Sequence, residues 1–322
     1  MSKSERIAEI IKTAQAAAQN HPNTKLAPAM TALKNENYVD AIKLLTQITG
    51  SSDIEKSTLS FNLAFAYYKL GKIDEMVGNL KKAEALGFNP NKIINLFFCA
   101  GIELLKTNNF VLVKEELTDA EKTTAFPGAE KAIGIFKYII ENKACPLDFK
   151  IDVYARLHEA YELLLVINPT QSVAKLSIAA LKDAIKSYNE KDQTSRKLAL
   201  TIYKKLGNID LDEYLNEIKK SDNSGRHHNK AYEDLQSANN YLQSAFKIDE
   251  NDPELLNNFG VAKHLLAKMT TEPKKCQELY KEAEVTLATA ILIGQGTDDH
   301  ILHYQDNLKA LEEDLSLLGI SS

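Results

Sequence analysis

Glycine and proline are scarce in this chain of 322 residues, which contains 13 glycines and 8 prolines. Both residues are common in β-turns, so their scarcity argues against a fold built from many short strands. Ala, Leu, Lys, Glu and Ile dominate the composition instead, and most of these residues favour helices. No β-hairpin pattern competes with this tendency, and we therefore predict an all-α protein.

Cysteine is rare as well. The three cysteines, Cys99, Cys145 and Cys276, are far apart in the sequence and form no CxxC pair. An odd and sparse set of cysteines is typical of a reducing compartment rather than of a disulfide framework. We expect a cytoplasmic protein.

An excess of positive charge is absent, because 39 lysines and arginines face 44 aspartates and glutamates, for a formal net charge of −5. A nucleic-acid backbone would meet no general electrostatic attraction from such a chain. The composition therefore argues against nucleic acid as the partner.

Long hydrophobic runs are also missing. The longest apolar stretch, residues 93–105, contains Asn95 and Glu103 and is shorter than the roughly 20 residues that a membrane span needs. The first six residues are mostly polar and charged, without the apolar core of a secretory signal, and lead into an Ala-rich amphipathic helix. We expect a soluble intracellular protein with no membrane span.

Motifs for catalysis or cofactor binding are incomplete. Gly71-Lys72 lacks the earlier glycine and the following Ser or Thr of a phosphate-binding loop. His158-Glu159 begins like a zinc-protease motif, but residue 162 is Glu where the second histidine belongs, so we expect His158 to be a surface or packing histidine. No GxSxG motif is present. We assign no catalytic or cofactor-binding residue and predict that the chain is not an enzyme.

A metal site would need more ligands than the histidines provide. His300 and His303 are three residues apart in a predicted helix, with Asp299 as a possible third ligand. No further carboxylate or cysteine completes a set, and the adjacent pair His227-His228 lies in a polar run. We therefore predict no metal.

The most informative segment is residues 57–90, which read STLSFNLAFAYYKLGKIDEMVGNLKKAEALGFNP. It is 34 residues long, and its positions fit a pair of antiparallel helices that pack closely through small residues. The key residues are Leu63 and Ala64 as a packing pair, Tyr67 as the aromatic, Gly71 in the turn, and Leu80 and Ala83 on the second helix. This segment resembles the tetratricopeptide repeat, although Ser60 replaces the usual Trp and Met76 the usual Ala.

Weaker copies surround this segment. Residues 24–35 predict a first helix, and a second helix is expected to begin near Tyr38. In residues 94–120, Ala100-Gly101 takes the place of the packing pair, and a second helix is expected to open at Phe110 and close at Ala120. Seven to nine helical hairpins, many of them irregular, are expected over the whole chain.

The later part of the chain continues this pattern less clearly. Residues 152–168 predict a helix that Asn168-Pro169 ends. Residues 194–219 predict a hairpin that turns at Gly207. In residues 241–266, Asp252-Pro253 is a typical helix start, and Phe259-Gly260 is the next packing pair.

The polar run over residues 221–229 is the best candidate for a linker. It would separate repeats in residues 1–220 from further repeats in residues 230–322. A long loop inside one continuous superhelix is the alternative. Residues 299–318 predict a terminal helix whose polar outer face caps the array.

The resemblance implies a right-handed superhelix (an α-solenoid) whose first helices line a concave groove. It also implies a non-catalytic scaffold or adaptor that binds a peptide or helix of another protein, mainly through apolar contacts. The residues that would line this groove are Phe61, Asn62, Phe65, Tyr68, Lys69, Phe98, Ile102 and Leu105. Two alternatives stay open: the groove is covered by the chain itself, or the protein is a helical-repeat enzyme or regulator with a small-molecule site. The oligomeric state is also open.

Four basic groove positions further along the chain suggest a site for an acidic segment: Arg156, Lys197, Lys204 and Lys205. Glu159 and Glu162 are expected beside them. We therefore favour a neutralised and solvated face.

Overall fold

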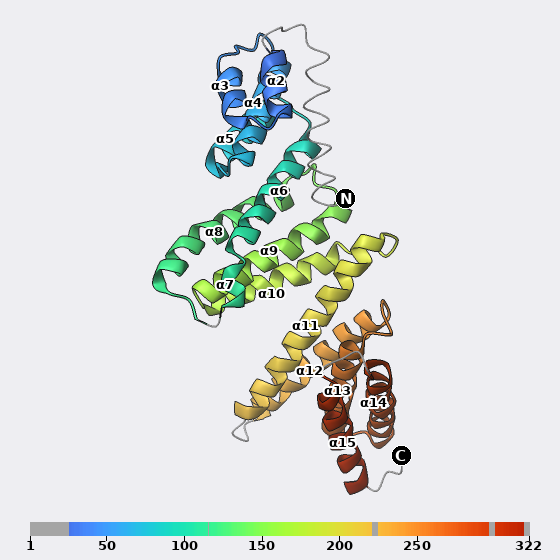
Figure 1. Ribbon diagram of the computed structural model, residues 1–322. Helices are drawn as coiled ribbons and strands as arrows, with labels where there is room; N and C mark the ends of the chain where they lie inside the picture. The colour runs from blue at the N-terminus through green and yellow to red at the C-terminus, as the bar shows by residue number, and fades with distance from the viewer. Residues whose placement is uncertain (1–25, 115, 221–224, 296–299, 319–322) are drawn as a thin grey trace. The chain divides into compact units, whose positions relative to one another are not determined.

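The computed structural model describes residues 26–114, 116–220, 225–295 and 300–318, and within these ranges the regular structure is entirely helical (Figure 1). The prediction of an all-α protein is thus confirmed for the described part of the chain. The expected amphipathic helix at the start of the chain lies outside these residues.

The chain divides into two compact units, residues 1–180 and residues 181–322. The helices that begin in the first unit are α2 (Leu26–Lys34), α3 (Tyr38–Thr46), α4 (Asp53–Lys69), α5 (Ile73–Ala85), α6 (Pro90–Asn108), α7 (Phe110–Val113), α8 (Asp119–Glu141), α9 (Leu147–Ile167) and α10 (Gln171–Lys186). Those of the second unit are α11 (Gln193–Lys220), α12 (Gly225–Phe246), α13 (Pro253–Met269), α14 (Pro273–Gly294) and α15 (Ile301–Leu317). The helix α10 spans the division between the units.

The α4–α5 hairpin is the segment that the sequence describes best. Gly71, between the two helices, has a φ of +70°, the left-handed conformation that glycine adopts without strain. Ala64, Leu80 and Ala83 are completely buried where α4 packs on α5. The close approach of two helices through small residues is therefore confirmed here.

Several predicted helix boundaries are also confirmed. The helices α2 and α3 occupy the positions expected for a hairpin before residue 50, and α9 ends at Ile167 with Asn168 as its C-cap. Asp252 caps α13, since its Oδ1 accepts the Leu255 N–H at 2.9 Å, and Pro253 is the first helical residue. The terminal helix is α15, which begins two residues later than expected.

The predicted second helix over residues 110–120 is wrong. The helix α7 ends at Val113, and a new helix, α8, begins at Asp119. Thr118 and Glu121 form a capping box, in which each side chain bonds the backbone N–H of the other. This local start signal separates α7 from α8, so Ala120 opens a helix instead of closing one.

The predicted hairpin over residues 194–219 is also wrong, because α11 continues through Gly207 without a turn. A Cβ atom on Gly207 would lie 2.6 Å from Cγ of Leu242 on α12. The absence of a side chain at Gly207 therefore allows α11 and α12 to pack closely. The glycine serves this contact and does not form the turn that the sequence suggested.

The division between the two units lies within α10, whereas the sequence suggested a linker at residues 221–229. Residues 221–224 lie outside the described part of the chain, and the helix α12 begins at Gly225.

The apolar run around α6 belongs to the interior of the first unit. Within the described ranges one segment, Pro90–Val113, is long and apolar enough to cross a membrane by length and composition alone. Eight of the nine residues of α6 from Ile93 to Gly101 are buried in the structure, and the ninth, Asn95, is partly buried. Packing against neighbouring helices accounts for this hydrophobicity.

Candidate functional site

The eight residues predicted to line a groove lie in the first unit, on α4 and α6. Five of them are buried: Phe61, Asn62, Phe65, Tyr68 and Phe98. The other three, Lys69, Ile102 and Leu105, are partly buried. The structure thus brings the set together but covers most of it.

The aromatic side chains of α4 contact rings from the same chain. Phe61 stacks on Phe88, which follows α5, with ring centroids 4.3 Å apart. Phe65 meets Tyr38 of α3 edge to face at 6.3 Å. The Nζ atom of Lys69 lies 5.8 Å from the centre of the Phe65 ring and 5.9 Å from that of Tyr38. These contacts fill the space that a hydrophobic ligand would otherwise take.

Phe98 of α6 is covered by the next helices along the chain. Its ring lies 4.7 Å from that of Phe149 on α9 and 6.1 Å from that of Phe136 on α8. Ile102 and Leu105 pack at the edge of the same core. The side of α6 that was expected to extend the groove therefore packs partly inside the first unit.

Tyr68 lies where α4 approaches α6. Burial raises the pKa of its phenol, and the nearby Cys99 and Glu103 raise it further. The hydroxyl group is therefore protonated at neutral pH and able to donate a hydrogen bond.

Asn62 differs from its apolar neighbours. Only 1% of its surface is exposed, and neither Oδ1 nor Nδ2 has a hydrogen-bond partner among the residues that the structure describes. A buried amide in this state costs about 1–3 kcal/mol relative to a satisfied one. Such groups are uncommon in folded proteins and call for an explanation.

In this structure the chain itself covers the five buried side chains of the predicted groove. This matches the alternative in which the groove is filled from within. That these residues bind a partner stays a prediction.

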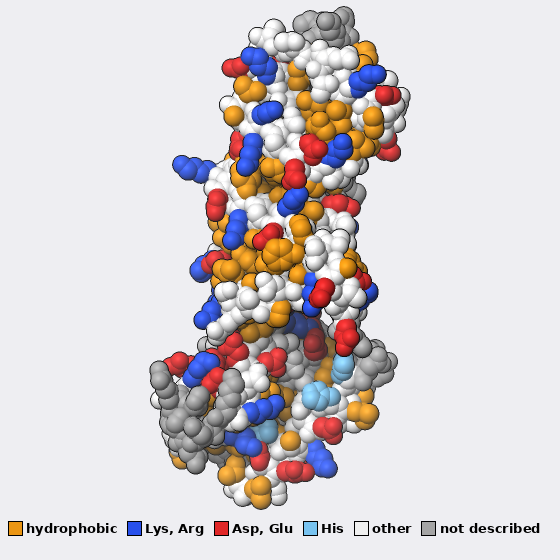
Figure 2. Space-filling view, turned by 90° about the vertical axis from the view of Figure 1, so that its left-hand side faces the viewer, with side chains coloured by type: hydrophobic (Ala, Val, Ile, Leu, Met, Phe, Trp, Pro, Cys, Tyr) orange, Lys and Arg blue, Asp and Glu red, His pale blue; other side chains and the backbone are white. Residues whose placement is uncertain are grey.

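An apolar recess of about 330 Å³ opens between α5, α6 and α8. Val77, Phe97 and Ile135 line it, and Lys131 forms an ion pair of 2.8 Å with Asp74 among its lining residues. Figure 2 views the molecule from the left of Figure 1, and over the first unit it shows hydrophobic patches interrupted by charges of both signs. The recess is large enough for one bulky side chain.

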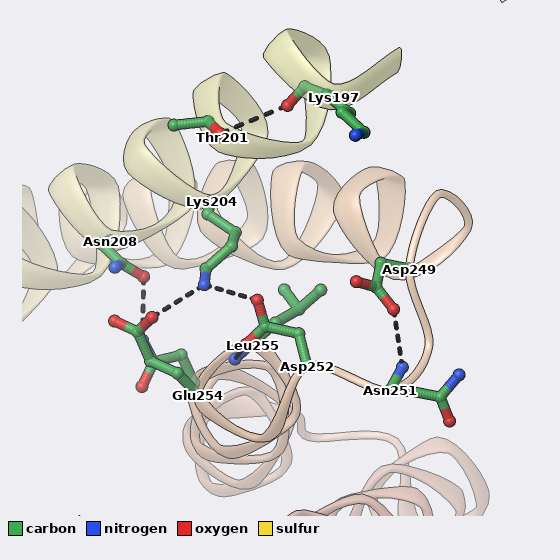
Figure 3. Close-up of polar contacts among 10 residues, drawn as sticks. Lys197, Thr201, Lys204, Asn208, Asp249, Asn251, Asp252, Glu254 and Leu255 are labelled. Atoms are coloured by element: carbon green, nitrogen blue, oxygen red, sulfur yellow. Dashed lines mark hydrogen bonds and ion pairs between the residues drawn. The ribbon is translucent and has the colours of Figure 1, made fainter. Parts of the chain in front are cut away.

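The second unit contains three of the four basic residues for which the sequence suggested an acidic ligand, namely Lys197, Lys204 and Lys205 on α11. Lys204 of α11 pairs with Asp252 and Glu254 at the start of α13, each at 2.7 Å (Figure 3). Burial by itself lowers the pKa of Lys204, but the bonds to the two carboxylates outweigh it and raise that pKa. Lys204 is thus already neutralised by its own chain.

The acidic residues that the sequence suggested as partners are confirmed for Arg156 but not for Lys204. Glu159 pairs as expected with Arg156, at 2.7 Å on α9 of the first unit. The other expected partner, Glu162, accepts a hydrogen bond from Ser177 at 2.6 Å. Asp252 and Glu254, which pair with Lys204, were missed because they lie 48 and 50 residues further along the chain.

A serine, a histidine and a carboxylate meet at the contact between α9 and α10. Ser177 Oγ lies 2.7 Å from His158 Nδ1 and donates to Glu162 Oε1. Both Ser177 and His158 are buried, and the carboxylate bonds the serine rather than orienting the histidine. This arrangement lacks the geometry of a nucleophilic triad, and His158 is a packing histidine, one of the two roles expected for it.

No group of three or more His, Cys, Asp and Glu side chains is placed to hold a metal within the described ranges. His303 Nε2 lies 3.5 Å from Nδ2 of Asn307, one turn further along α15. Asp299, the proposed third ligand, lies outside those ranges.

A search against models of protein families found no match, and neither did a search of curated proteins. Solved structures do resemble the chain. One is the nuclear import adaptor Nro1 of S. pombe, with a TM-score of 0.52 and 13% identity over 94% of this chain and 96% of that one. A second crystal form of Nro1 gives a TM-score of 0.51 at 13% identity, over 96% and 99% of the two chains. At this identity the similarity shows a shared fold.

Proposed function

We propose that this chain is a non-catalytic adaptor that binds another protein through the face of α4 and α6, and that it works in the cytoplasm. The similarity in fold to Nro1, described as a nuclear import adaptor, supports the adaptor class by analogy. A right-handed superhelix of the tetratricopeptide type is part of the same proposal. Such a protein holds its partner through side chains along a helix face rather than through reactive groups.

The observation that carries this proposal is the unpaired amide of Asn62. An amide side chain offers both an acceptor and a donor, which match the N–H and C=O groups of a peptide backbone. A partner segment that places one peptide unit against Asn62 would satisfy both atoms at once. Burying an amide without partners destabilises the free chain, and binding would recover that energy.

Access to Asn62 requires the chain around α4 to open locally. The aromatic contacts of Phe61 and Phe65 would then become available to the partner, and large aromatic side chains commonly contribute most to binding. The site is therefore one in which the chain's own contacts are exchanged for those of a partner.

The substitution Asn62→Leu tests this proposal. Leucine has the same branched shape but no polar atoms, so we expect the free protein to gain about 1–3 kcal/mol of stability, because the unpaired amide is removed. The same variant should capture less of the partner that the unaltered chain captures from its source cells. Thermal unfolding and quantitative affinity capture measure the two effects.

Asn216→Leu is the matched control, because Asn216 is exposed on α11 of the other unit. It should retain the captured partner. If Asn62→Leu captures every protein that the unaltered chain does, the α4–α6 face is not the binding site. A variant that both binds less and is less stable would show that Asn62 has a packing role only.

A further inference from the structure

A second opening lies in the second unit, where the segment before α11 meets the end of α12. It is a cavity of about 370 Å³. Its walls include two tyrosines, Tyr188 and Tyr203, and three cations, Lys191, Arg196 and Lys247. These five residues define the tyrosine–cation pocket.

The tyrosines form an aromatic wall. The rings of Tyr188 and Tyr203 are perpendicular, with centroids 6.4 Å apart, and Tyr241 of α12 lies 6.3 Å from Tyr203. Burial raises the pKa of Tyr203, with a further contribution from the two neighbouring phenols. The wall therefore presents ring surface and protonated hydroxyl groups.

The three cations are exposed, and none has an ion-pair partner among the residues that the structure describes. Lys204, two turns along α11 from Arg196, is by contrast paired with two carboxylates.

The acidic side chains close by are few or already engaged. Glu190 is the acidic residue of the lining. The carboxylate of Asp192 accepts the Ser195 N–H at 2.6 Å, and that of Asp249 accepts the Asn251 N–H at 3.0 Å. Three cations against one lining carboxylate leave the pocket with an excess of positive charge on a chain whose net charge is −5. An anionic ligand is therefore complementary to it.

The exposure of the cations distinguishes between anionic ligands. A small metabolite is normally held with most of its surface buried, whereas the three cations that line this pocket are exposed to solvent. A polypeptide that passes over the opening would place acidic side chains on the cations and insert one apolar side chain against the tyrosines. Its neighbouring residues would supply the remaining contacts.

We propose that the tyrosine–cation pocket binds an acidic segment of a partner protein that also carries a bulky apolar or aromatic side chain. This inference rests on the proposed adaptor function, but it concerns a different unit of the chain from Asn62. It adds the chemical character of the segment that the partner presents.

Fluorescence anisotropy with a labelled synthetic pentapeptide tests the inference on the full chain. The probe has two acidic residues on each side of a phenylalanine, and the comparison peptide has lysines in place of the acids. We expect the acidic probe to bind at least tenfold more tightly than the basic one. Its affinity should also fall as salt is added, because the contacts are between exposed charges. Equal binding of both peptides, or of neither, would contradict the proposal.

Charge reversal locates the site. The double variant Arg196→Glu with Lys247→Glu should weaken the acidic probe at least tenfold, and Tyr188→Leu should weaken it severalfold. Lys309→Glu, at an exposed position on α15, is the matched control and should bind as the unaltered chain does. If adenosine monophosphate competes with the probe more strongly than the unlabelled acidic peptide does, the pocket is a small-molecule site and the inference is wrong.

The test of the tyrosine–cation pocket can fail or succeed independently of the test of the proposed adaptor function. The Asn62→Leu variant should still bind the acidic probe. A partner that is lost by Asn62→Leu but fully retained by the charge-reversed variant would support the adaptor function and contradict the role of this pocket. A probe that binds the pocket in a chain that captures no partner would contradict the adaptor function instead.

Discussion

At the scale of single residues, Phe65 fits either a ligand-binding role or a core role until its neighbours in the fold are known. Its place on α4 fits a ligand-facing residue of the tetratricopeptide pattern. In the structure only 2% of its surface is exposed, and it packs against Tyr38 and Lys69. Burial of an aromatic ring at this level makes it a contributor to stability.

Phe65→Lys should therefore destabilise the protein by about 3 kcal/mol or more, because it removes a buried ring and places a charge in its position. A fall in melting temperature measures this effect. Val39→Lys on α3 is the control. Because 65% of the surface of Val39 is exposed, the melting temperature of this variant should hardly change. A stable Phe65→Lys protein would mean that this face of α4 is open to solvent.

At the scale of helices, three glycines lie where two helices approach each other closely. A Cβ atom on Gly101 would lie 2.7 Å from the Phe136 ring, and one on Gly260 would lie 2.6 Å from Leu287 Cγ. Both glycines had been identified as members of packing pairs. Gly207 plays the same part against Leu242, although its sequence neighbours suggested a turn.

Gly207→Ala should destabilise the second unit by about 1–3 kcal/mol, because the added methyl group overlaps Leu242. Gly134→Ala is the opposite case, since no atom lies within 4 Å of the position of its Cβ. That substitution in α8 should raise stability by about 0.5–1 kcal/mol through helix propensity alone. Denaturant unfolding measures the free energy of unfolding of both variants. If Gly207→Ala is more stable than the unaltered chain, α11 and α12 are further apart than the structure places them.

The contact between α13 and α15 makes stability depend on pH. His264 Nε2 and Lys268 Nζ of α13 each lie 2.8 Å from Oδ2 of Asp314 on α15. Burial lowers the pKa of His264, and Asp314 offsets only part of this. A histidine whose pKa is lower in the folded state than in the unfolded one favours unfolding when it is protonated.

The protein should therefore lose stability as the pH falls from neutral through the ordinary pKa of histidine towards the lowered one. His264→Gln does not titrate but can still donate to Asp314, so its stability should fall less between pH 7 and pH 5. Thermal unfolding at several pH values measures this difference. An equal loss in both proteins would exclude His264 as the titrating group.

At the scale of the whole molecule, the two compact units differ in the kind of opening that they present. The first has an apolar recess, and the second has a pocket of tyrosines and cations. The lining of the first opening is mainly apolar, and that of the second carries an excess of positive charge. Neither was visible in the sequence, because the residues of each come from separate helices.

Features that depend on a few neighbouring residues were determined by the sequence itself. They include the predominance of helix, the turn at Gly71, the cap at Asp252 and the small residues of the α4–α5 hairpin. Each follows from propensity or capping within about one helical turn, so no knowledge of distant residues is needed.

Only the tertiary structure decided which helix faces are covered and which charges are paired. Phe98 is buried by rings of α8 and α9, and Lys204 is neutralised by carboxylates about 50 residues away. A helix presents the same pattern of side chains whether its face meets solvent, a partner or another helix of the chain. That choice depends on how successive hairpins stack, which is set by packing between residues far apart in sequence.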